Sequence, residues 1–505
     1  MDRNLKLLVF WQFCLLISQV TIGYDNSLVG SLQTMPQWLN SMGHPSNNIL
    51  GFLVCAIFIG SFASAFFAPT ICDRFGRRIT IFLGSVLCIV GLVLQAVSNG
   101  RVLFIVGRII AGIGVGLDTC GGAILILELA HPSHRGTISS MYNVLWYIGS
   151  IMAAWISFGT SYMKTTWSWR IPCIFQGLPA LWVAIAIIFS PESPRYLYSR
   201  GRTREAEAIL TYYHANGQES HPIVLQEMAE ISTALDVEAE LEPQSFLSTL
   251  KVPAYRKCYA ICIAVSLFTN WCGQSVISYY FSPILKSLGI SSTPEQTGIN
   301  GGLQVWNLLC SLTGAFLAER IGRRRLWLSS FLGMIGANVA LTITSAIYAQ
   351  KGDLGAARAS IVFLFFYDAF FNIACNPLLY SYPPEILPYR IRGKGMGVLI
   401  LTSEVALTVN EEVNPIALAK IGYYFYIFYL GVLILATSYI YLFFPETKGL
   451  TLEELSHRSL NNARWLEASV FRKADVLNSE DGAGAGESEA EMVKVDIPKF
   501  PGERT

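Results

Sequence analysis

The chain has 505 residues, of which 52% are hydrophobic and only 14% charged, and its formal net charge is +1. A soluble globular chain carries about 25% charged residues, so this composition favours a membrane protein. The near-neutral balance gives no indication of a nucleic-acid partner. The 11 cysteines lie almost entirely within apolar runs and are interpreted as packing residues rather than metal ligands or disulfides, so no metal or other cofactor is expected.

Long apolar runs recur along the chain. They cover residues 7–29, 50–70, 79–97, 102–124, 139–158 and 172–189, and then 258–285, 297–317, 326–348, 361–380, 396–418 and 423–444. Runs of this length are typical of membrane-spanning helices, and no run alternates like a barrel strand. The first run has no obvious cleavage site and is interpreted as a retained span rather than a signal peptide. We therefore predict an all-α membrane protein with twelve transmembrane helices.

Three short motifs occur twice, in the same order. The charged stretch at 73–78 returns at 319–325, the pair formed by Glu128 and Arg135-Gly136 returns as Glu385 and Arg392-Gly393, and Pro191-Glu192-Ser193 returns as Pro445-Glu446-Thr447. Repeats in register indicate two copies of one unit. We predict six-helix halves at 1–190 and 258–445, a linker at 191–257 and a mostly disordered tail at 446–505.

The linker and the short loops predict the orientation. Helical spacing of Ala206, Ile209, Leu210 and Tyr213, and again of apolar residues at 224–235, predicts short amphipathic helices in the linker. Lysine and arginine gather in the loops at 74–78, 320–325 and 390–394, which share one side of the membrane. By the positive-inside rule that side, the linker and both termini are cytoplasmic, and we expect the plasma membrane.

Two repeated six-helix units are the pattern of a secondary transporter whose site lies between its halves. The chain resembles sugar porters of the major facilitator superfamily over residues 23–454, through Gly23-Tyr24-Asp25, Gly107-Arg108 and the repeated motifs. Residues 278–280, 382–388 and 414–418 are similar to the fungal lactose- and cellodextrin-permease branch. The resemblance implies the major facilitator fold, alternating access, and a sugar, a proton and the lipid bilayer as partners.

Asp25 and Arg108 are charged residues within predicted spans, where charge is costly and usually functional. Counting along the two helices places both in the outer half of the membrane, so we expect them to pair. The resemblance implies that Asp25 is the proton-coupling site. A purely structural ion pair is the alternative.

Amides, hydroxyls and aromatic faces within the spans are the candidate sugar ligands, because a sugar ring offers hydroxyls and apolar faces. The candidates are Asn143, Tyr147, Asn270, Gln274, Ser275, Tyr279, Asn307 and Tyr380. Asn270 and Gln274 stand four residues apart, which predicts one helix face. Hydrogen bonding between helices is the alternative role for each. Hexose porters carry other residues at Asn143, Ser275 and Tyr380, so the identity of the sugar stays open.

The charged loop residues are the candidate gate. They are Asp73, Arg77, Glu128, Arg135, Glu319, Arg323, Glu385 and Arg392. The resemblance implies that they hold the cytoplasmic side shut in the outward-facing state. The alternative, a topology signal alone, explains the basic residues but not the acids. Four further acids within the spans, Asp118, Asp368, Glu404 and Glu411, have as candidate roles substrate contact, proton binding or hydrogen bonding inside the bundle.

The sequence thus predicts a proton-coupled transporter of a mono- or disaccharide. A sugar sensor that binds without transporting, or a transporter of a non-sugar metabolite, are the alternatives. We find no nucleophile–base pair, phosphate-binding loop or metal cluster, so an enzyme is not expected.

Overall fold

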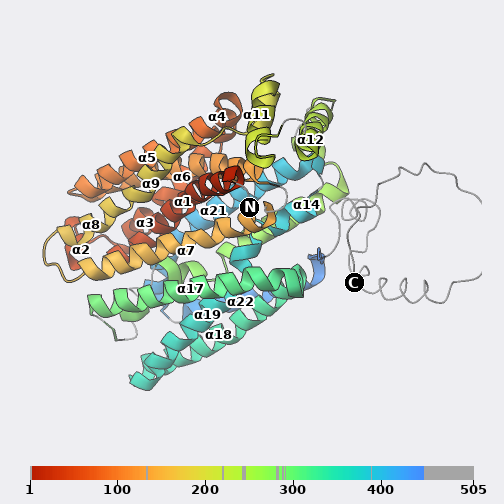
Figure 1. The fold of residues 1–505 in the computed structure, drawn as a ribbon. Helices are drawn as coiled ribbons and strands as arrows, with labels where there is room; N and C mark the ends of the chain where they lie inside the picture. Colours follow the sequence, from red (N-terminus) through yellow and green to blue (C-terminus); the bar gives the residue numbers. More distant parts are fainter. Residues whose placement is uncertain are drawn as a thin grey trace, which may run out of the picture. The chain divides into compact units, whose positions relative to one another are not determined.

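The computed structural model describes residues 3–448, apart from 132–134, 219–220, 241–245, 280–283, 287–288, 291, 388 and 423. The predicted disordered tail therefore lies outside the described residues. Within the described part, the regular elements are helices (Figure 1).

The first six spans extend from α1 to α9. The bounds are α1 (Arg3–Leu32), α2 (Pro36–Ser41), α3 (Asn47–Ser64), α4 (Ala68–Phe75), α5 (Arg77–Val97), α6 (Arg101–Leu129), α7 (Arg135–Thr160), α8 (Trp167–Phe175) and α9 (Gly177–Phe189). The predicted span at 50–70 ends early, at Ser64, and a separate short helix follows it. The sixth span begins at Trp167 and is divided at Gln176, close after Pro172, which removes a backbone hydrogen bond from its helix.

The segment between the two sets of spans forms α10 (Pro194–Ser199), α11 (Thr203–His214), α12 (Pro222–Glu240) and α13 (Phe246–Thr249). Ala206 and Leu210 of α11 are buried, and Leu210 packs against Val224 of α12 with Met228 and Ile231 beside them. The predicted amphipathic pattern therefore folds as helices that bury their apolar faces against each other and against the bundle.

The last six spans extend from α14 to α22. The bounds are α14 (Pro253–Asn270), α15 (Gln274–Tyr279), α17 (Thr293–Ile321), α18 (Arg323–Lys351), α19 (Leu354–Leu378), α20 (Tyr382–Ile386), α21 (Tyr389–Ile421) and α22 (Tyr424–Phe443). The seventh span is not one continuous helix, because α14 ends at Asn270 and α15 begins at Gln274. Gly273 lies between them with φ +104°, a conformation that favours glycine.

Among the described residues, nine helical stretches are long and apolar enough to cross a membrane. The remaining spans are α7, α17 and α21, and α7 contains a shorter apolar stretch, Val144–Thr160. Together they give the twelve-helix arrangement, so the predicted fold class is confirmed.

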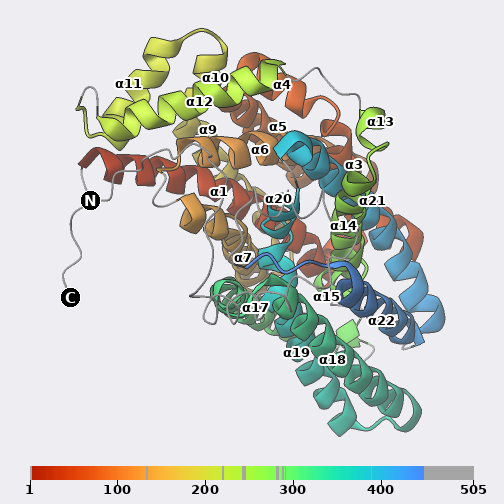
Figure 2. The ribbon, with the colours of Figure 1, turned by 90° about the vertical axis from the view of Figure 1, so that its right-hand side faces the viewer.

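The two sets of spans meet chiefly where α3 packs along α21 and where α7 packs along α17, and we call these the α3–α21 seam and the α7–α17 seam. Smaller contacts join α1 to α15 and α7 to α19. Figure 1 shows α7 beside α17, and Figure 2 shows α3 and α21 on the same side of the bundle. We call the end of the bundle that carries Arg77, Arg78, Arg323 and Arg324 the basic end, and the end that carries α2 the far end.

Candidate functional site

Asp25 of α1 and Arg108 of α6 form an ion pair within the membrane helices. The Arg108 guanidinium lies 3.4 Å from the Asp25 carboxylate, and the two residues are 0% and 1% exposed. A second guanidinium nitrogen donates to the carbonyl oxygen of Val54 at 3.3 Å, and the Gln176 side chain hydrogen-bonds to Asp25. An isolated charge would be very costly here, so each ionised side chain depends on the other.

A second group of charged residues lies at the basic end. Arg77, at the start of α5, donates to both oxygens of Glu128 on α6, at 3.1 and 3.4 Å. Asp73 lies 3.6 Å from Arg77. Glu128 also accepts a hydrogen bond from the hydroxyl of Ser193, which in turn accepts from the Tyr196 N–H as the N-cap of α10. This network therefore joins α4, α5, α6 and α10.

The same network occurs again in the second half. Arg323 donates to Glu385 at 3.0 and 3.3 Å, and Glu385 accepts from the Thr447 hydroxyl at 2.5 Å. Arg323, Glu385 and Thr447 thus correspond to Arg77, Glu128 and Ser193. The sequence repeat is therefore reproduced as a repeat of contacts.

A further acid in each half caps the turn between two spans. Glu192 accepts from the backbone N–H groups of Arg78 at 3.3 Å and Ser193 at 2.9 Å. Glu446 accepts from the N–H groups of Arg323 at 2.8 Å and of Thr447 and Lys448 at 3.1 Å each. Burial raises the pKa of Glu192, while the N–H groups of Ser193 and Arg78 counteract that rise.

The turns themselves are built on glycine. Gly76 and Gly322 have φ values of +97° and +99°, and a Cβ added there would lie 2.6 Å from a Glu192 oxygen and 2.7 Å from a Glu446 oxygen. Sequence reasoning did not assign roles to Glu192, Ser193, Glu446 and Thr447. The signal that identifies them is their repeated Pro-Glu-Ser/Thr motif.

For three of the predicted gate residues the structure describes the backbone only. Arg135 begins α7, Glu319 lies in the last turn of α17, and Arg392 lies in the first turn of α21. Their side chains are outside the described residues. The described gate contacts are therefore Asp73–Arg77–Glu128 and Arg323–Glu385.

The predicted amide ligands of the seventh span are engaged with the protein. The Asn270 amide donates to the Ser266 carbonyl and to the Ser403 hydroxyl, at 2.8 Å each. Ser275 donates to the Asn270 carbonyl at 3.3 Å, and Gln274 donates to Ser278 at 2.5 Å. The expectation that Asn270 and Gln274 share one helix face is wrong, because the chain leaves the helix between them.

Tyr147 and Asn307 lie near each other at the α7–α17 seam. The Asn307 amide donates to Asp368 of α19 at 2.9 Å, and the Tyr147 hydroxyl donates to Asn372, one turn further along α19. Nearby, the Ser150 hydroxyl donates to the Gln304 oxygen at 2.6 Å. Tyr147 and Ser150 belong to the first half, so these hydrogen bonds join the two halves.

The other predicted ligands lie elsewhere or are not described. Tyr380 lies two residues after the end of α19 and is 39% exposed. Asn143 lies on α7 and Tyr279 ends α15, and the side chains of both are outside the described residues. The described candidates thus fall into three places: Asn270 with Ser275 and Gln274, Tyr147 with Asn307, and Tyr380.

The four acids without an assigned role lie in different places. Asp118 of α6 accepts from Ser85 of α5 at 3.2 and 3.3 Å, within the first half. Glu404 of α21 accepts from Ser61 of α3 at 3.1 Å, across the α3–α21 seam. Glu411 is buried on α21 in the second half, and Asp368 lies beside the α7–α17 seam. Among the described residues, His, Cys, Asp and Glu side chains form no group that could hold a metal ion.

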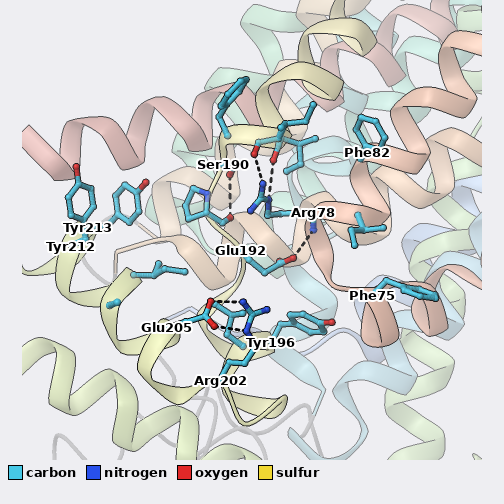
Figure 3. Close-up of a pocket in the computed structure, with 18 residues that line it drawn as sticks. Phe75, Arg78, Phe82, Ser190, Glu192, Tyr196, Arg202, Glu205, Tyr212 and Tyr213 are labelled. Atoms are coloured by element: carbon cyan, nitrogen blue, oxygen red, sulfur yellow. Dashed lines mark hydrogen bonds and ion pairs between the residues drawn. The ribbon is translucent and has the colours of Figure 1, made fainter.

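A cavity of about 750 Å³ opens at the basic end between α5, α9 and α11 (Figure 3). Aromatic rings of Phe82, Tyr212 and Tyr213 line it, and Arg202 and Glu205 form an ion pair at 2.5 Å on its wall. The predicted substrate residues do not line this cavity.

Comparisons with known proteins cover nearly the whole described chain. A family profile described as "Sugar (and other) transporter" matches residues 11–458. The sugar transporter STL1 of Saccharomyces cerevisiae is 29% identical over 500 residues, which cover 94% of this chain and 86% of that protein. The high glucose sensor RGT2 of the same yeast is 28% identical over 476 residues, which cover 91% of this chain and 60% of the sensor.

The chain is also similar to solved structures of a sugar transporter. The proton:xylose symporter XylE, a major facilitator protein from E. coli, has been solved with bound 6-bromo-6-deoxy-D-glucose. It matches with a TM-score of 0.73 and 25% identity, covering 89% of this chain and 98% of that chain.

Proposed function

Because the chain belongs to the sugar (and other) transporter family of the major facilitator superfamily, we propose that it is a proton-coupled symporter of a mono- or disaccharide. The observation that carries this proposal is the buried Asp25–Arg108 pair, since a carboxylate held ionised by one arginine is a group that protonation can release. A similar chain, XylE, is described as a proton:xylose symporter, which supports the coupling.

The orientation of the helix bundle across the membrane follows from the distribution of its basic residues. The basic end, with Arg77, Arg78, Arg323 and Arg324, is the cytoplasmic end by the positive-inside rule. The linker helices and both termini then lie in the cytoplasm, and the far end faces the outside of the cell. We place the protein in the plasma membrane, where an outside-to-inside proton gradient can drive uptake. In this assignment residues 1–190 and 258–445 are the two moving halves.

Alternating access is supported by where the halves touch. Ser31 of α1 accepts from Asn300 at 3.2 Å, and Thr293 donates to the carbonyl of Thr34 at 3.0 Å, both toward the far end. These contacts join the halves on the outer side. We infer that this structure is the state closed to the outside, and that the gate networks of the two halves meet in the opposite state.

The substrate site lies between the halves, near the two seams. We assign Tyr147, Asn307, Asn270, Gln274, Ser275 and Tyr380 to it, with Asn143 and Tyr279 on the same helices. The motifs at 278–280, 382–388 and 414–418 support placement in the fungal lactose- and cellodextrin-permease branch. The amides that already bond within the second half would have to exchange those partners for substrate hydroxyls during the cycle.

Uptake by cells that lack their own sugar carriers tests the proposal. We expect uptake of at least one labelled mono- or disaccharide, stimulated by external acid. Uptake without any response to an imposed pH gradient contradicts symport and would mean that the protein transports sugar by facilitated diffusion. Sugar binding without uptake favours a sensor, the second candidate, which the similarity to RGT2 supports.

A further inference from the structure

The second half carries a buried acid, Asp368, in the middle of a membrane helix. In the described part of α14–α22, the lysines and arginines lie in the first or last two turns of their helices, away from Asp368. The first half differs, because its Asp25 has Arg108 as an ion-pair partner. Ionised carboxylates in this interior therefore need a positive charge that the second half does not supply.

Asp368 and Asn307 together present acceptors that have no donor. The two residues are 0% and 1% exposed. One Asp368 oxygen accepts from the Asn307 amide at 2.9 Å, while the other Asp368 oxygen and the Asn307 oxygen are buried without a hydrogen bond. An unsatisfied buried acceptor costs roughly 1–3 kcal/mol. The place beside the Tyr147–Asn372 contact, where the halves join, is therefore suited to a group that donates several hydrogen bonds.

We propose that the transported solute carries a protonated amine, as an amino sugar does, and that Asp368 is the carboxylate that pairs with it. This inference rests on the proposed function and narrows its substrate class. A neutral sugar hydroxyl can satisfy a buried acceptor, but it cannot balance a carboxylate's charge. A primary ammonium supplies three N–H donors together with that charge.

The test compares three probes that share one sugar ring on the purified full-length protein. Glucosamine carries the amine, N-acetylglucosamine keeps the nitrogen without its charge, and glucose lacks it. Thermal unfolding measures binding of each, since a ligand that binds the folded state raises its stability. At a pH where the amine is protonated, we expect glucosamine to bind at least about tenfold more tightly than either neutral probe.

Variants connect that preference to Asp368. Asp368→Asn keeps the size of the side chain and removes its charge, and it is expected to reduce the preference for glucosamine to about twofold or less. Asp118→Asn is the matched control, because Asp118 is a buried acid whose carboxylate is hydrogen-bonded by Ser85 within the first half. The preference of the Asp118→Asn variant for glucosamine should equal that of the unmodified protein.

The outcomes separate this inference from the proposed function. Equal binding of the three probes, or binding of none, overturns the amine preference. Uptake of glucose with no preference for glucosamine overturns it too and leaves sugar transport in place. Binding of an ammonium compound without a sugar ring, together with no binding of glucose, supports the charge and contradicts sugar transport.

Discussion

Arg323 donates to Glu385 at 3.0 Å in the same arrangement as Arg77 donates to Glu128 at 3.1 Å, although the two pairs belong to different halves of the chain. In both halves the arginine uses its planar fork, with two nitrogens on the carboxylate and a third toward a backbone carbonyl. Repetition of this detail indicates that the fork itself, and not only its charge, is needed at the basic end.

Replacing Arg77 or Arg323 with lysine should slow transport while insertion and surface expression stay normal. Lysine keeps the positive charge that sets topology but cannot bond a carboxylate and a carbonyl in one plane. Loss of about one hydrogen bond, worth roughly 1 kcal/mol, corresponds to transport about fivefold slower. Initial uptake rates measure it, with Arg325→Lys as the control because that side chain is exposed at the same turn. Normal rates in both variants would mean that the loops act only as topology signals.

Gly76→Ala and Gly322→Ala should each lower the stability of the folded protein, and by more than the cost of the backbone conformation alone. With ψ values of 166° and 155° beside their positive φ, the two glycines occupy a region that is essentially restricted to glycine, where another residue costs roughly 1–3 kcal/mol. Here the added Cβ would also lie under 3 Å from the capping carboxylates of Glu192 and Glu446. Gly201→Ala is the matched control, because Gly201 has φ +73° and nothing within 4 Å of an added Cβ. Thermal unfolding in detergent makes the comparison, and equal losses in all three variants would contradict the role of the cap.

Tyr147→Phe should weaken the closure between the halves. The Tyr147 hydroxyl donates to Asn372 across the junction, and a hydrogen bond of this kind contributes about 0.5–1.5 kcal/mol. The balance should therefore shift about two- to tenfold toward the state open at the far end. Labelling of a cysteine introduced near the far end reports that opening. Tyr24→Phe is the control, since the Tyr24 hydroxyl donates to the Pro172 carbonyl within the first half and should leave the labelling rate unchanged.

The twelve spans were predictable because a chain that crosses lipid must satisfy its backbone hydrogen bonds within a helix. The long apolar runs that such helices require are visible in the hydropathy of the sequence. The break in the seventh span was not predictable in the same way. Gly273 and its neighbours are compatible with an apolar helix by hydropathy, and the turn depends on local backbone conformation and on the Tyr429 ring beside it.

Side-chain partners from distant spans were predictable only where charge or repetition marked them. The repeated motifs marked Arg77 with Glu128 and Arg323 with Glu385. Nothing in the sequence marked Asn307 as the partner of Asp368, because that contact depends on how α17 packs against α19. Helical spacing alone predicts which residues share one face of a helix. It does not predict which other helix that face contacts.

The proton switch at Asp25 is the central claim, and Asp25→Asn tests it most directly. The asparagine imitates the neutral carboxyl, so Arg108 loses its ion-pair partner permanently. Exchange of sugar across the membrane requires no net proton movement, whereas uphill accumulation does. The two activities are measured side by side in proteoliposomes, as counterflow and as accumulation driven by an imposed pH gradient. The account predicts that Asp25→Asn keeps counterflow and loses accumulation. Accumulation against a gradient by this variant would contradict it and would place the proton site at another carboxyl, with Glu404 and Glu411 the next to be tested.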